Sequence, residues 1–144
     1  MKAVVIYESR TGNTERAAQL VAAELQERGC EVSLFPTKGV DLKALAEADV
    51  AIVGTWTDGA VLFGQRPGGA GNIAKHLPMI WDKPTFGFVT YAIRAGGVLR
   101  GFNKLLTSLG ADVRGGLELH RKHLDTDAVD FAGAVLDAFQ PANR

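Results

Sequence analysis

The fold of this chain is decided by residues 4–14, which read VVIYESRTGNT. The first four residues are β-branched or aromatic, which is typical of a buried β-strand. The residues that follow are nearly all hydroxyl, amide, charged or glycine residues, which indicates a short loop. A helical pattern begins at once, so this loop lies between the carboxyl end of a strand and the amino end of a helix.

The loop gathers groups that can bind a phosphate. A helix is predicted over residues 13–28, and its first turn offers unpaired backbone N–H groups and the positive end of the helix dipole. The loop side chains add hydroxyl and amide donors, and its glycine lets the backbone approach a ligand closely. The candidate phosphate-binding residues are Ser9, Arg10, Thr11, Gly12, Asn13 and Thr14.

Two common phosphate loops do not match this segment. It lacks the Gly-Lys-Ser/Thr ending of a Walker loop and the G-x-G-x-x-G pattern of dinucleotide-binding folds. Hydroxyl and amide donors without a lysine are expected for a terminal monophosphate. The alternative is that these residues only cap the helix, but one capping residue would be enough for that.

The loop resembles a known motif. Residues 9–14, together with Tyr7 before them and Ala18 and Val21 after them, resemble the FMN phosphate loop of the flavodoxin family. The resemblance implies an α/β sandwich that binds FMN non-covalently and transfers electrons with a redox partner protein. Flavodoxins that shuttle electrons are typically acidic, and this chain departs from that pattern.

Composition limits the class of protein. The 144 residues suit one domain, 1–144, and carry sixteen basic and sixteen acidic side chains, a balance that argues against nucleic-acid binding. No apolar run approaches the roughly 20 residues of a membrane span, and no signal peptide is expected. The single Cys30 cannot form an internal disulfide, so we expect a cytoplasmic protein.

Strand and helix patterns alternate along the whole chain. Strands are predicted at residues 2–7, 31–35, 49–54, 85–90 and 113–119, and helices at 13–28, 42–46, 72–77, 97–109 and 126–139. This alternation predicts a parallel sheet covered by helices on both faces, a three-layer α-β-α sandwich. The resemblance implies five strands in the order 2-1-3-4-5. In the last helix we expect Val129 to face inward.

A second loop follows the strand at residues 49–54. Trp56 comes just after a buried strand, among small and polar residues, so it is well placed to stack on a planar ring. The alternative is that Trp56 anchors the loop. The segment resembles the T-W-G-D segment of flavodoxins, which implies a flavin contact for Thr55, Trp56, Thr57, Asp58 and Gly59.

Thr57 stands where the family often has glycine. The resemblance implies that a peptide in this turn flips when the flavin is reduced. A flip to positive φ is easy for glycine and costs a β-branched residue on the order of 1 kcal/mol or more. We therefore predict a smaller gap between the two one-electron potentials than in a typical flavodoxin, unless Gly59 supplies the freedom.

A third loop lies between the strand at 85–90 and the next helix. The resemblance implies that Tyr91 stacks on the second face of the flavin and that Thr90 and Gly97 flank the site. The loop has no carboxylate but contains Arg94, and a cation near reduced flavin should raise its potential. A solvated Arg94 is the alternative.

The remaining polar residues suggest no further site. The three histidines have no carboxylate or cysteine at metal-ligand spacing. Residues 121–123 are interpreted as a solvated turn, with a docking patch as the alternative. The predicted function is an FMN-binding electron-transfer protein. The alternative is an FMN-dependent oxidoreductase that uses NAD(P)H or a quinone-type acceptor, and a scaffold domain without FMN is a third class.

Overall fold

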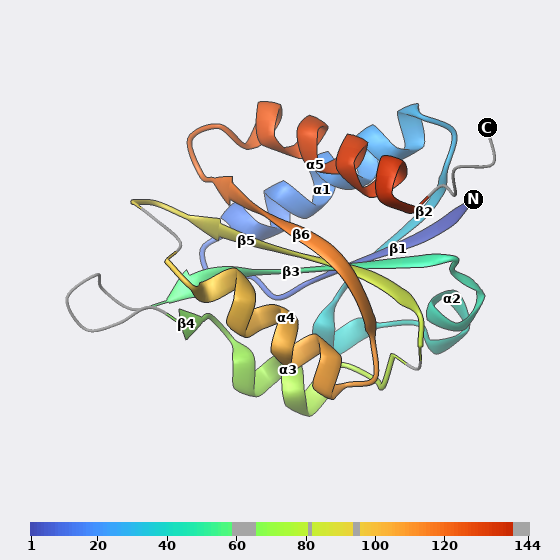
Figure 1. The fold of residues 1–144 in the computed structure, drawn as a ribbon, viewed down its shortest axis with the longest axis horizontal. Helices are drawn as coiled ribbons and strands as arrows, with labels where there is room; N and C mark the ends of the chain where they lie inside the picture. Colours follow the sequence, from blue (N-terminus) through green and yellow to red (C-terminus); the bar gives the residue numbers. More distant parts are fainter. Residues whose placement is uncertain (59–65, 81, 94–95, 140–144) are drawn as a thin grey trace.

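The structure is a computed structural model that describes residues 1–58, 66–80, 82–93 and 96–139. Strands and helices alternate along it, as Figure 1 shows. The elements are β1 (Lys2–Tyr7), α1 (Asn13–Glu27), β2 (Glu31–Pro36), the 3-10 turn η1 (Thr37–Gly39), α2 (Leu42–Glu47), β3 (Val50–Asp58), β4 (Arg66–Pro67), α3 (Ala70–His76), β5 (Pro84–Tyr91), α4 (Val98–Ser108), β6 (Asp112–His120) and α5 (Leu124–Phe139).

The long strands form one parallel sheet in the order β2-β1-β3-β5-β6. Counting only these five strands, the order is 2-1-3-4-5, so the predicted α/β fold and strand order are confirmed. All five strands end at the same edge of the sheet, because they run in the same direction. The loops that follow β1, β3 and β5 therefore meet there.

Helices cover both faces of the sheet, as Figure 1 shows. The helices α1 and α5 pack on one face, around a core that includes Val5, Phe88 and Phe131. The helices α2, α3 and α4 contribute to a second core on the other face, around residues such as Ile6 and Phe102. Val4, Val5 and Ile6 are completely buried, which a strand achieves only when both faces of the sheet are covered.

The third strand of the sheet is longer than predicted. β3 continues through Trp56, which pairs with Thr90 of β5, and ends at Asp58. The two-residue strand β4 runs antiparallel to the end of β3 and pairs Thr57 with Pro67. The prediction ended this strand at residue 54 because small and polar residues follow. The backbone pairing with two neighbouring strands outweighs that local preference.

The last helix also differs in detail. α5 begins at Leu124, two residues earlier than predicted. Val129 is 40% exposed, so the expectation that it faces inward is wrong. The buried stripe of α5 runs through Leu124, Ala128, Phe131, Ala132 and Val135. This stripe follows the three- and four-residue spacing of a helix face, and Val129 lies beside it.

Candidate functional site

A cleft of about 230 Å³ opens where the carboxyl ends of β1, β3 and β5 meet. All three loop segments predicted from sequence contribute to its wall, although they are far apart in the chain. The residues that line it are Arg10, Thr11, Asn13, Thr14, Trp56, Thr57, Thr90, Tyr91, Ala92 and Arg121.

The loop after β1 is shaped by Ser9 and Gly12. The Ser9 hydroxyl oxygen accepts hydrogen bonds from the backbone N–H of Gly12 at 3.2 Å and of Glu15 at 3.3 Å. Gly12 has a φ of 100°, a left-handed conformation that favours glycine. Ser9 thus folds the loop back on the first turn of α1, and it does not line the cleft.

The loop before α1 and the first turn of the helix have free backbone donors on residues that line the cleft. Among the hydrogen bonds of the described residues, none uses the backbone N–H of Thr11, Asn13 or Thr14. The Thr14 hydroxyl lies 2.9 Å from the Thr90 hydroxyl and is buried, so it ties the helix start to the end of β5. Unpaired amides at a helix start are suited to an anion such as a phosphate.

Trp56 forms the wall of the cleft on the β3 side. Its indole packs closely on Gly68, where an added Cβ would come within 2.0 Å of the ring atom Cε2. Gly68 is held in place from both sides. Its N–H donates to the Trp56 carbonyl at 2.6 Å, and its carbonyl accepts from the Thr55 hydroxyl at 2.5 Å. Thr55 is completely buried, and its hydrogen bond fixes the Gly68 backbone on which Trp56 packs.

The end of β3 carries two buried polar atoms that have no hydrogen-bond partner among the described residues: the Trp56 indole nitrogen and the Thr57 hydroxyl oxygen. Both residues line the cleft. The backbone of Asp58 pairs with Arg66 of β4. The predicted contact of Gly59 lies outside the described residues, as does that of Arg94 in the third loop.

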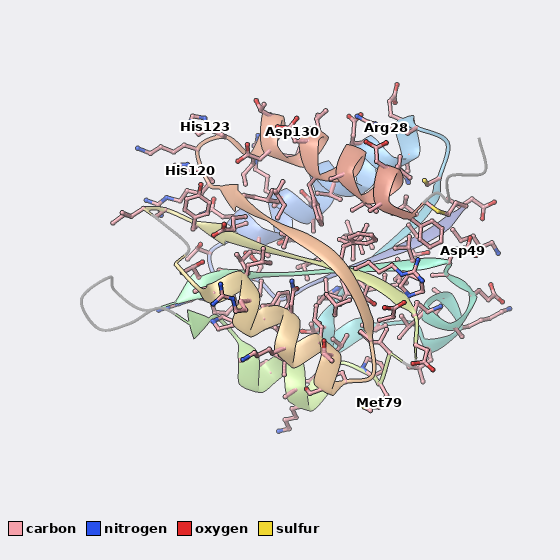
Figure 2. The ribbon with its side chains drawn as sticks, viewed as in Figure 1. Arg28, Asp49, Met79, His120, His123 and Asp130 are labelled. Carbon is pink, nitrogen blue, oxygen red and sulfur yellow. The ribbon has the colours of Figure 1, made fainter. Side chains whose placement is uncertain are left out.

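Tyr91 closes the cleft at the end of β5. Its ring is half-buried and meets the His120 ring edge-on, with 5.0 Å between ring centroids and 83° between planes. Figure 2 labels His120 at the end of β6 and His123 beyond it.

Gly97 precedes α4 and lines a separate recess of about 660 Å³ between α4 and β6, not the cleft.

Arg121 also lines the cleft, although it was not predicted from the sequence as a site residue. Its backbone N–H donates to the Tyr91 carbonyl at 2.9 Å, which holds it beside the end of β5. The signal was available in the strand order, because residues that follow β6 must emerge at the same edge as those that follow β1, β3 and β5.

Three further hydrogen bonds stabilise the edge of the sheet beside the cleft. The Tyr7 hydroxyl donates to the Glu15 carboxylate at 3.1 Å, and burial, followed by this contact, raises the pKa of Tyr7 above its ordinary value. The Glu8 carboxylate accepts from the Thr37 hydroxyl and, at 3.2 Å, from the Asn72 side-chain amide. These bonds join Tyr7 of β1 to α1, and Glu8, directly after β1, to η1 and α3.

The chain belongs to the flavodoxin family. A family model described as a flavodoxin domain matches residues 4–97, a range that includes the segments after β1, β3 and β5 that line the cleft, but not Arg121. Membership of this family implies a flavin cofactor.

In the described residues, no helix is long and apolar enough to cross a membrane.

Solved structures share the fold. A cysteine-to-serine mutant of flavodoxin from Pseudomonas aeruginosa matches 98% of this chain and 100% of its own at 23% identity, with a TM-score of 0.72. Oxidised flavodoxin 1 from Bacillus cereus matches 95% of this chain and 98% of its own at 19% identity, with a TM-score of 0.70. A short-chain flavodoxin associated with a non-canonical PDU bacterial microcompartment matches 97% and 99% at 17% identity, also with a TM-score of 0.70.

Proposed function

We propose that this protein binds FMN non-covalently in the cleft and transfers electrons between partner proteins in the cytoplasm. The observation that carries the proposal is the start of α1, where the backbone N–H groups of Thr11, Asn13 and Thr14 are free in the described structure. They lie in the same cleft as Trp56 and Tyr91. A phosphate site and two aromatic side chains in one cleft match the two ends of a flavin mononucleotide.

The residues of the cleft fit the chemistry of this cofactor. An added Cβ on Gly12 would meet no atom within 4 Å, so the loop leaves open space above the helix start. Hydroxyls and an amide surround that space without a lysine, which suits a terminal monophosphate. The aromatic side chains supply flat apolar surface for a ring system. The cleft of about 230 Å³ is smaller than the roughly 300–1,000 Å³ of pockets that enclose a ligand, so one edge of the flavin would stay exposed.

The chain's own residues would bind and orient the cofactor. FMN, when bound, supplies the redox chemistry. The free amides and the hydroxyl of Thr11 would hold the phosphate, and Trp56 and Tyr91 would cover the ring. Arg10 and Arg121 in the cleft wall would make negative charge on the reduced cofactor less costly, which raises its potential.

The visible absorption spectrum of the purified protein tests this proposal. We expect flavin bands in the protein as isolated, or bands that shift when FMN is added to flavin-free protein and that bleach on stepwise addition of dithionite. A protein that binds no FMN would overturn the proposed function. Steady oxidation of NAD(P)H by the FMN-loaded protein alone would instead identify a reductase.

Thr57→Gly is expected to widen the gap between the two one-electron potentials of bound FMN. Thr57 is held in the β3–β4 pairing, and turning its peptide to positive φ costs a β-branched residue roughly 1–3 kcal/mol. Removing about 1 kcal/mol of that cost corresponds to about 40 mV for one electron. A redox titration that follows the one-electron-reduced flavin at long wavelength measures the change.

Thr57→Ala is the matched control for this prediction. Alanine also removes the hydroxyl and the branched side chain, but it does not gain glycine's freedom at positive φ. We expect the alanine variant to keep a narrow gap. If alanine and glycine widened the gap equally, the backbone explanation would be wrong and the side chain itself would be responsible. Nearly complete accumulation of the one-electron-reduced form in the unchanged protein would also contradict the backbone explanation.

A further inference from the structure

We infer that the mouth of the cleft docks a redox protein whose own redox centre is surrounded by carboxylates. The docking surface consists of a cationic rim, defined here as Arg10, Arg121 and Lys122, and an apolar tip, Ile93. This inference rests on the proposed FMN function, because the rim surrounds the position at which the flavin edge would be exposed.

The charge of the rim is one-sided. Arg10 and Arg121 line the cleft, and no carboxylate belongs to its described lining. Lys122 lines an adjoining recess of about 340 Å³, which shares Asn13 and Arg121 with the cleft. All three rim residues are exposed, so their charges act on a partner that approaches through water.

One carboxylate lines the adjoining recess, and it is paired with a cation. Asp125, in the same recess, accepts from the Arg16 guanidinium at 2.9 Å, and this pair cancels. Glu15 and Asp127 accept hydrogen bonds from neutral donors, the Tyr7 hydroxyl and the backbone N–H of His120 at 2.9 Å, and keep their charges. Both are half-buried, and neither lines the cleft or the recess. Among the described charged residues that line the cleft and the recess, the cationic rim therefore remains as a local excess of positive charge.

The overall charge makes this local excess decisive. Sixteen basic and sixteen acidic side chains give the chain a formal net charge of zero, so no overall charge attracts or repels a partner. Orientation in an encounter is then set by local patches, which steer association within a Debye length of the surface. A patch of positive charge selects a partner with negative charge around its own site.

The apolar tip gives the same surface a contact point. Ile93 is 79% exposed and lies two residues after Tyr91, beside the exposed Ala92. The Tyr91 carbonyl accepts from the backbone N–H of Arg121, so the apolar tip and the rim are joined at the end of β5. An exposed apolar side chain beside charged residues adds the apolar contact that protein–protein interfaces use.

Two forms of one haem protein test the sign of the docking charge. Native cytochrome c is basic, and succinylation of its lysines makes it acidic without changing its haem. The FMN-loaded protein is fully reduced with dithionite, separated from excess dithionite under nitrogen, and mixed with each form. The reduced anionic flavin gives one electron to each of two ferric haems and releases one proton, which yields oxidised FMN and two ferrous haems.

We expect the succinylated form to be reduced about tenfold faster than the native form at low salt. The difference should disappear between about 0.01 M and about 1 M salt, because the screening length falls from about 30 Å to about 3 Å. Faster reduction of the native form, or rates of the two forms that do not depend on salt, would overturn the docking proposal while leaving the FMN proposal intact. Failure to bind FMN would overturn the FMN proposal.

A matched pair of lysine variants locates the effect. Lys122→Glu reverses one charge of the rim, at an exposed residue outside the lining of the cleft. Lys43→Glu makes the same charge change on α2, at the opposite end of the sheet in Figure 1, where the side chain is 82% exposed. We expect Lys122→Glu to reduce the low-salt preference about threefold and Lys43→Glu to leave it unchanged. Equal effects of the two variants would overturn the docking proposal.

Discussion

Gly54→Ala is expected to destabilise the protein by about 3 kcal/mol, at the upper end of what overpacking of a core usually costs. An added Cβ at Gly54 would come within 2.0 Å of the Phe88 ring, on the neighbouring strand. Phe88 cannot move aside easily, because it is completely buried and packs edge-on against Phe131 with 5.7 Å between centroids. For a domain of this size we expect a fall in Tm of about 10 °C, measured by circular dichroism.

Gly71→Ala is the control for this change. Gly71 lies in α3, and an added Cβ there would meet no atom within 4 Å. Alanine also favours a helix over glycine by up to about 1 kcal/mol, so this variant should be as stable as the unchanged protein or slightly more stable. A Gly54→Ala variant that unfolds at the same temperature as the Gly71→Ala variant would show that the core accepts the extra carbon.

Gly68→Ala is expected to weaken FMN binding at least about tenfold, or about 1.4 kcal/mol, with a smaller effect on stability. The new Cβ would overlap the Trp56 indole, and the two hydrogen bonds of the Gly68 backbone prevent Gly68 from moving. The indole would have to leave its place in the cleft wall. A titration that follows quenching of FMN fluorescence measures the affinity, and tryptophan emission reports the movement of the ring.

The Gly71→Ala variant again provides the control, since Gly71 lies three residues further along the same segment and does not line the cleft. It should bind FMN as the unchanged protein does. If Gly68→Ala kept full affinity while its tryptophan emission changed, Trp56 would not contribute to the flavin site. The interpretation of Trp56 as a residue that only anchors the loop would then be correct.

Much of the fold follows from local patterns. Continuous apolar runs such as residues 50–53 predicted buried strands, and the alternation of strands with helices predicted a parallel sheet covered on both faces. The strand order came from the resemblance to a family and is confirmed by the pairing of the strands. The boundaries of the strands were less predictable. β3 extends to Asp58 because it pairs with β4 and β5. β5 is distant in the sequence, and β4 was not predicted.

The cleft was predictable at the level of segments and less so at the level of individual side chains. The segments after β1, β3 and β5 do meet in one cleft, because parallel strands end at the same edge. The sequence did not reveal that the hydroxyls of Ser9 and Thr55 point to backbone groups instead of the cleft. It also did not reveal Arg121, whose place depends on how β6 lies beside β5.

The sequence by itself determined the family, the order of strands and helices, and the loop that precedes α1, because each depends on residues close together in the chain. Only the tertiary structure decided which donors are free, where Trp56 rests and which charges surround the cleft. Those features depend on contacts between residues such as Trp56 and Gly68, or Tyr91 and Arg121, that are separated in the sequence. Such contacts exist only after the sheet has formed and has brought the ends of its strands together.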